Sequence, residues 1–137
     1  MTVALAAVVD TAIDAAAVEA AVLSRVDGAL VTFRGVIRDH DAGHAVTRLD
    51  YSAHPDAEAF LRAACDRVAA STGLVVAAVH RVGTLDVGDV ALVAAVAAAH
   101  RAEAFAACST LIDTIKAEVP IWKRQHSPDG TTEWVGL

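Results

Sequence analysis

The chain has 137 residues, of which 55% are hydrophobic and only 4% aromatic, and its formal net charge at pH 7 is -6. This length fits one domain, predicted over residues 1–137, with enough chain to bury a real core. The acidic balance disfavours a nucleic-acid-binding protein, because such proteins usually present a basic face to the phosphates.

The apolar content raises the question of a membrane segment. The longest apolar run is VALVAAVAAA at residues 90–99, about half of what an α-helix needs to cross a bilayer, so it predicts a buried strand. The N-terminal TVALAAVV has no basic residue before it and meets Asp10 directly, unlike a signal peptide. Cys65 and Cys108 lack metal-ligand spacing and predict two buried thiols of a reducing compartment. The protein is therefore expected in the cytoplasm.

The first third of the chain predicts one helix and two strands. Residues 14–25 begin with Asp14, a residue type favoured at helix N-caps, and carry Ala, Val and Leu at helical spacing. Residues 29–37 and 46–53 are rich in β-formers and flank the turn-rich loop RDHDAGHA at 38–45. We expect these two strands to form an antiparallel pair.

The middle of the chain predicts a second helix and two buried strands. Residues 55–71 open with a proline, which favours a helix N-terminus, and Gly73 ends the helix. Its predicted apolar stripe comprises Ala57, Phe60, Leu61, Ala64 and Val68. Residues 74–83 and 90–99 follow as strands, joined by the polar, Gly-bearing turn TLDVGD at 84–89.

The last third predicts a third helix and a strand pair. Residues 100–119 form the helix, which ends before Pro120 because a residue preceding proline is disfavoured in the α region. Its predicted core stripe comprises Phe105, Leu111, Ile112 and Ile115. Residues 121–126 and 132–135 read as strands around the turn SPDG at 127–130. Helices and strands are thus mixed in one α+β domain.

Lys116 and Lys123 are the only lysines of the chain, which otherwise uses nine arginines. A lysine can shed its proton and act as a nucleophile or an acid, whereas an arginine stays a fixed cation. Structural roles remain open for both, because Lys116 sits in a last helical turn, where a cation is favourable, and Lys123 lies in a strand.

His100 and Arg101 lie where an apolar strand meets the third helix. Such a junction exposes backbone N–H groups and the positive end of the helix dipole, which suits an anion. Arg101 could clamp a phosphate or carboxylate, and His100 could titrate near neutrality. The alternative is a His packed against the turn and an Arg on the surface.

The segment FRGVIRD alternates along a strand. Phe33, Gly35 and Ile37 are predicted on one face, with Arg34, Val36 and Arg38 on the other. A glycine inside a strand often marks a bulge or a close backbone approach. Arg38, at the end of the strand, points beyond the sheet edge.

Other chemical signals are weak. His40 and His44 are four residues apart but lie in a loop with Gly43, so no metal site is predicted. The chain lacks GxSxG, P-loop and GxGxxG motifs, and no cofactor is predicted. His80 and Arg81 precede a glycine turn and predict a hydrogen-bonded structural pair.

In order along the chain, FRGVIRD, HRVGTLDVGD, AAHRAEAF and IDTIKAEVPIWKRQ are followed by DG and WV. These linked blocks resemble the MoaE family, the large catalytic subunits of molybdopterin synthase, over about residues 28–135. The resemblance implies an α+β fold of the α/β-hammerhead type, with a mixed, mostly antiparallel sheet and three main helices. It also implies a homodimer that binds small ubiquitin-like subunits to form a heterotetramer.

The activity implied by the resemblance is that of a sulfurtransferase. Two sulfurs pass from the thiocarboxylate on the C-terminal Gly-Gly of the small subunit to cyclic pyranopterin monophosphate, which forms the dithiolene of molybdopterin. The implied site residues are Lys116 and Lys123 as catalytic groups and Phe33, Arg38, His100 and Arg101 as substrate-binding groups. We hypothesise that Lys116 acts as acid/base or transient covalent partner, while Lys123 holds the thiocarboxylate or the substrate phosphate.

An alternative from another class is a non-catalytic anion-binding or partner-docking module on the same fold. Such a module would keep His100 and Arg101 but would not need both lysines. The chain departs from the family pattern at Ala98, where Ser is frequent, and at His54, where an aromatic Tyr is frequent. These departures concern pocket detail and partner contacts.

Overall fold

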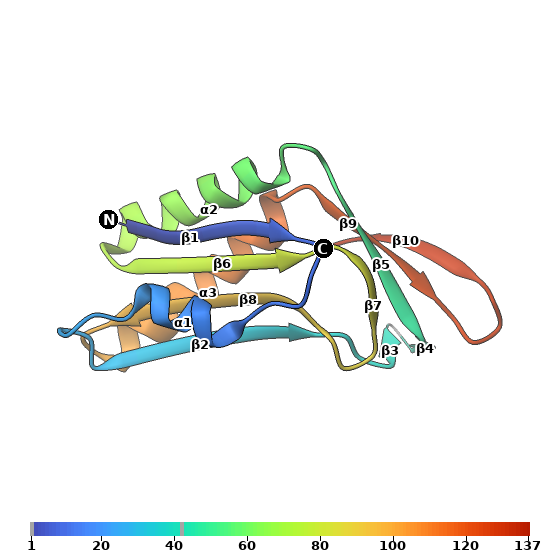
Figure 1. Cartoon of the computed structure of the whole chain (residues 1–137), viewed down its shortest axis with the longest axis horizontal. Helices are drawn as coiled ribbons and strands as arrows, with labels where there is room; N and C mark the ends of the chain where they lie inside the picture. Colours follow the sequence, from blue (N-terminus) through green and yellow to red (C-terminus); the bar gives the residue numbers. More distant parts are fainter. Residues whose placement is uncertain (1, 42) are drawn as a thin grey trace.

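The computed structural model describes residues 2–41 and 43–137, which form two four-stranded sheets, a two-stranded ladder and three helices (Figure 1). The elements in chain order are β1 (Thr2–Val9), α1 (Ala15–Val22), β2 (Ala29–Val36), β3 (His40–Asp41), β4 (His44–Ala45), β5 (Arg48–Ala53), α2 (Ala57–Thr72), β6 (Val75–Arg81), β7 (Gly83–Asp86), β8 (Val90–Ala98), α3 (Arg101–Glu118), β9 (Ile121–His126) and β10 (Thr132–Gly136). The predicted α+β class, with three helices and mostly antiparallel strands, is confirmed.

The first sheet has the strand order β1-β6-β8-β2, and only its β1–β6 pair is parallel. Helices α2 and α3 pack on one face of this sheet, and α1 covers the other (Figure 1). Because helices pack on both faces of this sheet, the central strands β6 and β8 are buried on both sides, which explains their runs of Val and Ala. The predicted burial of the strand at 90–99 is therefore confirmed.

The second sheet has the order β10-β9-β5-β7, is antiparallel throughout, and projects from one end of the first sheet (Figure 1). The chain leaves β6 and enters β7 through Gly83, whose φ of +99° lies in the left-handed region that favours glycine. After β7 the chain returns to the first sheet as β8. The ends of β2, β6 and α3 therefore meet the second sheet at one junction.

Four expectations about the strands were wrong or incomplete. β2 and β5 do not pair, because β2 pairs with β8 while β5 lies between β7 and β9 in the other sheet. Residues 84–86 belong to β7 rather than to a turn, and the loop at 38–45 contains the β3–β4 ladder. Residues 2–9 carry no predicted element, yet they form β1 beside β6. Apart from the β3–β4 ladder, these misses concern pairing between distant segments.

Three predicted helix ends are confirmed, whereas α1 ends at Val22 rather than at the predicted Arg25. The Asp14 carboxylate accepts a hydrogen bond from the backbone N–H of Ala17 at 3.2 Å and so caps α1. Gly73, with φ of +72°, donates its N–H to the carbonyl of Ala69 at 2.9 Å and ends α2. Helix α3 ends at Glu118, before Pro120.

Two aromatic side chains do not occupy the helix cores predicted for them. Phe60 on α2 is 48% exposed and Phe105 on α3 is 63% exposed. The packed faces of these helices are instead rich in Ala, with Cys65 and Cys108 among the buried residues. Small side chains let each helix approach the sheet closely, which leaves no room there for a ring.

The burial predicted for the two thiols is confirmed. Desolvation raises the pKa of Cys65 to about 11, and burial also raises the pKa of Cys108 above its usual range. Both side chains are therefore core groups at neutral pH rather than nucleophiles. Within residues 2–41 and 43–137, no helix combines the length and the apolar character that crossing a membrane requires.

Candidate active site

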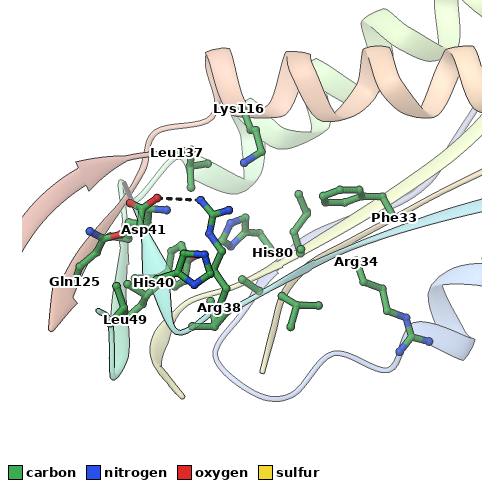
Figure 2. Close-up of a pocket in the computed structure, with 18 residues that line it drawn as sticks. Phe33, Arg34, Arg38, His40, Asp41, Leu49, His80, Lys116, Gln125 and Leu137 are labelled. Atoms are coloured by element: carbon green, nitrogen blue, oxygen red, sulfur yellow. Dashed lines mark hydrogen bonds and ion pairs between the residues drawn. The ribbon is translucent and has the colours of Figure 1, made fainter. Parts of the chain in front are cut away.

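A cavity of about 350 Å³ lies at the junction of the two sheets (Figure 2). Its walls come from the end of β2, from β5 and β9 of the second sheet, from the adjoining ends of β6 and β8, and from the last turn of α3. This volume is within the range of sites for small molecules. Segments distant in sequence thus share one concave surface.

Both lysines reach this cavity. The Lys116 side chain projects into the cavity from the C-terminal turn of α3 (Figure 2). The break at Pro120 sends the chain into β9, where Lys123 lies opposite Tyr51 of β5 and Val135 of β10. The helix end and the strand that follows it therefore place two ammonium groups in one pocket.

The environment of Lys123 favours loss of its proton. Half-burial lowers the pKa of Lys123 below its usual range, and the positive charges of Lys116 and Arg38 lower it further, whereas the Asp41 carboxylate acts in the opposite direction. A lysine with a lowered pKa can serve as an acid or base closer to neutral pH.

Arg38 stands at the mouth of the cavity, with its side chain 68% exposed. Its Nη2 donates to Asp41 Oδ1 at 3.0 Å, and this bond holds the pKa of Asp41 below its usual range. The bond fixes the guanidinium facing the cavity while leaving other donors free for a ligand.

The expectation that Arg38 shares a face with Arg34 was wrong: both residues line the cavity, but in Figure 2 the Arg34 side chain extends away from Arg38 and Lys116. The register of β2 against β8 shifts between Gly35 and Val36, and β2 ends at Val36. The predicted irregularity at Gly35 is therefore confirmed, and it interrupts the alternation of side chains before Arg38.

Phe33 forms an apolar wall of the cavity (Figure 2). Its ring lies beside Gly35, where an added Cβ would stand 3.4 Å from the Phe33 Cε1 atom. The ring also borders a shallow groove between β2 and α3. A partly buried aromatic ring in a basic pocket suits a planar ligand that carries a negative group.

His100 and Arg101 do not reach this cavity in the same chain. Both are exposed at the start of α3, where His100 is the N-cap residue and makes no capping hydrogen bond through its side chain. At a rise of about 1.5 Å per residue, Arg101 lies roughly 22 Å along the helix from Lys116. The structure thus brings together four of the six predicted site residues.

The cavity also contains polar residues that the sequence did not mark as functional. Asp41, Gln125 and His80 line it, and Gln125 and His80 are buried polar side chains. The predicted hydrogen bonding of His80 is confirmed, since its ring bonds the carbonyl of Arg81. The available signal was a histidine interrupting an apolar strand, which by itself also fits a core residue.

The charge of the site contrasts with that of the chain. Arg38, Lys116 and Lys123 line the cavity, with Asp41 as a carboxylate among them, in a protein whose net charge is -6. Concentrated positive charge in a concave site attracts a small anion. In the described part of the chain, no group of three or more His, Cys, Asp or Glu side chains is placed to hold a metal ion.

Comparisons with known proteins agree with this arrangement. The family model described as MoaE protein matches residues 8–118. The chain is 46% identical over 121 residues to molybdopterin synthase catalytic subunit 1 of Mycobacterium tuberculosis, a match that covers 85% of this chain and 80% of that protein. It is 40% identical over 114 residues to the molybdopterin synthase catalytic subunit of a Nostoc species, with 81% and 69% covered.

Solved structures give the same result. The crystal structure of molybdopterin synthase from Staphylococcus aureus superposes with a TM-score of 0.88 at 32% identity and covers 95% of this chain and 96% of that chain. A complex of subunits 1 and 2 of molybdopterin-converting factor from Helicobacter pylori shares the fold, with a TM-score of 0.70 at 17% identity over 95% of this chain and 88% of that chain. The chain belongs to the MoaE protein family.

Proposed function

We propose that the chain is the catalytic subunit of a molybdopterin synthase, a sulfurtransferase of molybdenum cofactor biosynthesis. In this reaction two sulfurs pass from a thiocarboxylate at the C-terminal Gly-Gly of a small ubiquitin-like subunit to cyclic pyranopterin monophosphate, forming the dithiolene of molybdopterin. The observation that carries the proposal is the convergence of Lys116, Lys123 and Arg38 on one cavity in a chain of this family.

The cavity offers a separate group for each part of the reactants. Arg38 binds the substrate phosphate and the Phe33 ring faces the pterin, a division of roles supported by the position of both residues in the cavity lining. Lys116 acts at the reacting centre as acid/base or transient covalent partner, and Lys123 holds the thiocarboxylate or the phosphate. The lowered pKa of Lys123 supports a proton-transfer role for this residue as well. No cofactor is required in this scheme.

The partner is the small ubiquitin-like subunit, whose extended C-terminal tail enters the cavity. The tail ends in glycines because glycine adds no side chain to a narrow passage. Two copies of the chain form a homodimer, and two small subunits complete a heterotetramer. The distance between the ends of α3 supports a shared site in which His100 and Arg101 of one protomer reach the cavity of its partner. We also infer that residues 1–137 act as one domain and that the protein works in the cytoplasm.

The direct test mixes the purified protein with a thiocarboxylated small subunit and cyclic pyranopterin monophosphate and measures the molybdopterin formed. The wild-type chain is expected to give product. Lys116→Ala should lower the rate at least about 100-fold, the usual effect of losing an acid-base or nucleophilic group, while a stable complex with the small subunit still forms. Retained turnover in Lys116→Ala would contradict its catalytic role. No product from the wild type, despite a stable complex, would indicate a docking module.

A further inference from the structure

His80 lines the cavity without a role in the reaction scheme above. It lies near the end of β6 with only 2% of its surface exposed, although the strand around it is apolar. In the view of Figure 2 its ring lies below the Lys116 side chain, and both residues line the cavity. Burying an imidazole costs free energy unless its nitrogens find partners, so its placement requires an explanation.

One nitrogen of the ring is fixed by the backbone. His80 Nδ1 lies 2.7 Å from the carbonyl oxygen of Arg81. A carbonyl can only accept, so Nδ1 carries the proton and Nε2 presents a lone pair. The Tyr51 ring packs edge-on against the imidazole, with centroids 5.2 Å apart and an interplanar angle of 67°. The orientation of the imidazole is therefore set before any ligand arrives.

The second nitrogen is left for the cavity. In residues 2–41 and 43–137, the side-chain nitrogens that are both buried and unpartnered are Nε of Arg81 and Nε of Arg124. His80 Nε2 is not one of them, and the hydrogen bond described for the ring is the one through Nδ1. His80 Nε2 is therefore an acceptor that opens on the cavity.

The imidazole is neutral at physiological pH. Burial lowers the pKa of His80 to about 4, the hydrogen bond to Arg81 opposes this shift, and the positive charge of Lys116 lowers the pKa further. Both side chains line the same cavity, so the Lys116 charge acts on the imidazole across it. A neutral imidazole can accept an N–H without adding the negative charge of a carboxylate, which would hold the proton on an ammonium group.

We propose that His80 is a positioning residue for Lys116: the Lys116 side chain turns from the position it has in the structure so that Nζ donates a hydrogen bond to His80 Nε2, and this bond aims it at the reacting centre. In the described part of the chain Lys116 has no ion pair or hydrogen bond of its own, so nothing else orients its long side chain. The His80 inference rests on the proposed function, since it assigns a role within the same site.

Two substitutions separate this role from a structural one. His80→Gln places an amide near the position of Nε2, so it keeps an acceptor for Lys116. His80→Asn places its amide near Nδ1, so it keeps the bond to Arg81 and loses the acceptor. We expect His80→Gln to retain most of the wild-type kcat, whereas His80→Asn loses about 10- to 100-fold in kcat with little change in KM, as for one lost hydrogen bond to a charged group.

A purely structural His80 gives the reverse order, with His80→Asn the more active variant, and that result would overturn the proposal. Equal losses in two folded variants, or none in either, would overturn it too. His126→Gln is the matched control, because this histidine also lies in a strand but bonds Asp50 on the opposite face of its sheet. Its kcat is expected to stay at the wild-type value, because the glutamine amide can still donate a hydrogen bond to Asp50 and keep the strand in place.

A measurement on the intact imidazole covers the case in which the His80 variants fail to fold. Nitrogen NMR of the wild-type protein should show His80 protonated at Nδ1 and neutral between pH 5 and 8. The Nε2 resonance should move in Lys116→Met, because its donor is removed, and an unmoved resonance would overturn the proposal. This readout does not depend on turnover, so an inactive wild-type chain would reject the proposed function and leave the His80 contact to be decided by NMR.

Discussion

At Lys123, burial and two like charges act together on one ammonium group. Half-burial disfavours the charged form of Lys123 and is the largest cause; Asp41 acts in the opposite direction, and Lys116 and Arg38 add repulsion. An arginine at this position would keep its charge under the same conditions, because its pKa is above about 12. The chain otherwise uses arginine, so a lysine at position 123 is explained if its ammonium group has to release a proton during the reaction.

The first prediction concerns Lys123→Arg. This substitution keeps the positive charge but removes the group that can release a proton, so kcat is expected to fall about 100-fold or more, the range for general acid-base catalysis. Molybdopterin formation gives the rate, and gel filtration checks that the small subunit still binds. Near-normal turnover in Lys123→Arg would show that this residue supplies only electrostatic attraction.

At the scale of elements, the Asp50 carboxylate connects three strands of the second sheet through hydrogen bonds. Asp50 of β5 accepts hydrogen bonds from Thr84 Oγ1 of β7 at 2.8 Å and from Arg124 Nη2 of β9 at 3.2 Å. It also bonds His126 Nε2, again on β9, at 2.6 Å. Because side chains alternate along β9, this cluster lies on the face opposite Lys123 and fixes the strand that carries it.

The second prediction concerns the pH dependence of this cluster. Burial tends to raise the pKa of Asp50, but the hydrogen bonds from His126, Thr84 and Arg124 outweigh it and lower the pKa from 3.8 to about 2. A folded-state pKa below the unfolded value adds about 2 kcal/mol to the unfolding free energy above about pH 4, and this contribution is lost as the pH falls towards 2.

Asp50→Asn should therefore lower the unfolding free energy by about 2 kcal/mol at pH 7 and by clearly less near pH 3, as measured by urea denaturation. Asp66→Asn is the control, because Asp66 is an exposed residue of α2, and a change within about 0.5 kcal/mol is expected there. An equally large difference for Asp50→Asn at both pH values would contradict the assignment.

At the scale of the whole molecule, α3 separates the predicted site residues into two groups. Lys116 lies at the end of α3 that faces the cavity, while His100 and Arg101 lie at the other end. One rigid helix cannot bring both ends to the same small substrate. If all these residues bind one substrate, two copies of the chain must face each other with their helices reversed.

The third prediction tests this arrangement by mixing two inactive variants. One variant is Lys116→Ala, and the other carries both His100→Ala and Arg101→Ala. In a homodimer of either variant, both sites are expected to be inactive. In a mixed dimer one cavity keeps its own Lys116 and receives intact His100 and Arg101 from the other protomer. Random reassembly should therefore restore about a quarter of the wild-type sites, as measured by molybdopterin formation.

A matched mixture provides the control for this experiment. Lys116→Ala mixed with Lys123→Ala should stay inactive, because both lysines line the cavity of one chain and neither cavity of a mixed dimer is complete. Absence of activity in the first mixture, with mixed dimers demonstrated by differently tagged chains, would place His100 and Arg101 outside the shared site.

The family and the α+β class follow from the sequence and are confirmed, and so are the features set by local backbone chemistry. The Asp14 cap, the left-handed Gly73 and the break at Pro120 each depend on a few neighbouring residues, so the sequence alone predicts them. The two lysines were recognisable for a similar reason, since their chemistry differs from that of arginine wherever the chain places them.

Only the tertiary structure decided which strands pair and which side chains meet. The partners of β5 are β7 and β9, and both pairings join distant segments whose apolar patterns fit several neighbours equally well. The register shift at Gly35 turned Arg38 towards the cavity, and burial at the junction of the two sheets gave His80 its fixed, neutral form. Helix caps, turns and side-chain chemistry depend on a few neighbouring residues and can be predicted from the sequence. Burial and proximity depend on how the two sheets pack, so they are known only from the tertiary structure.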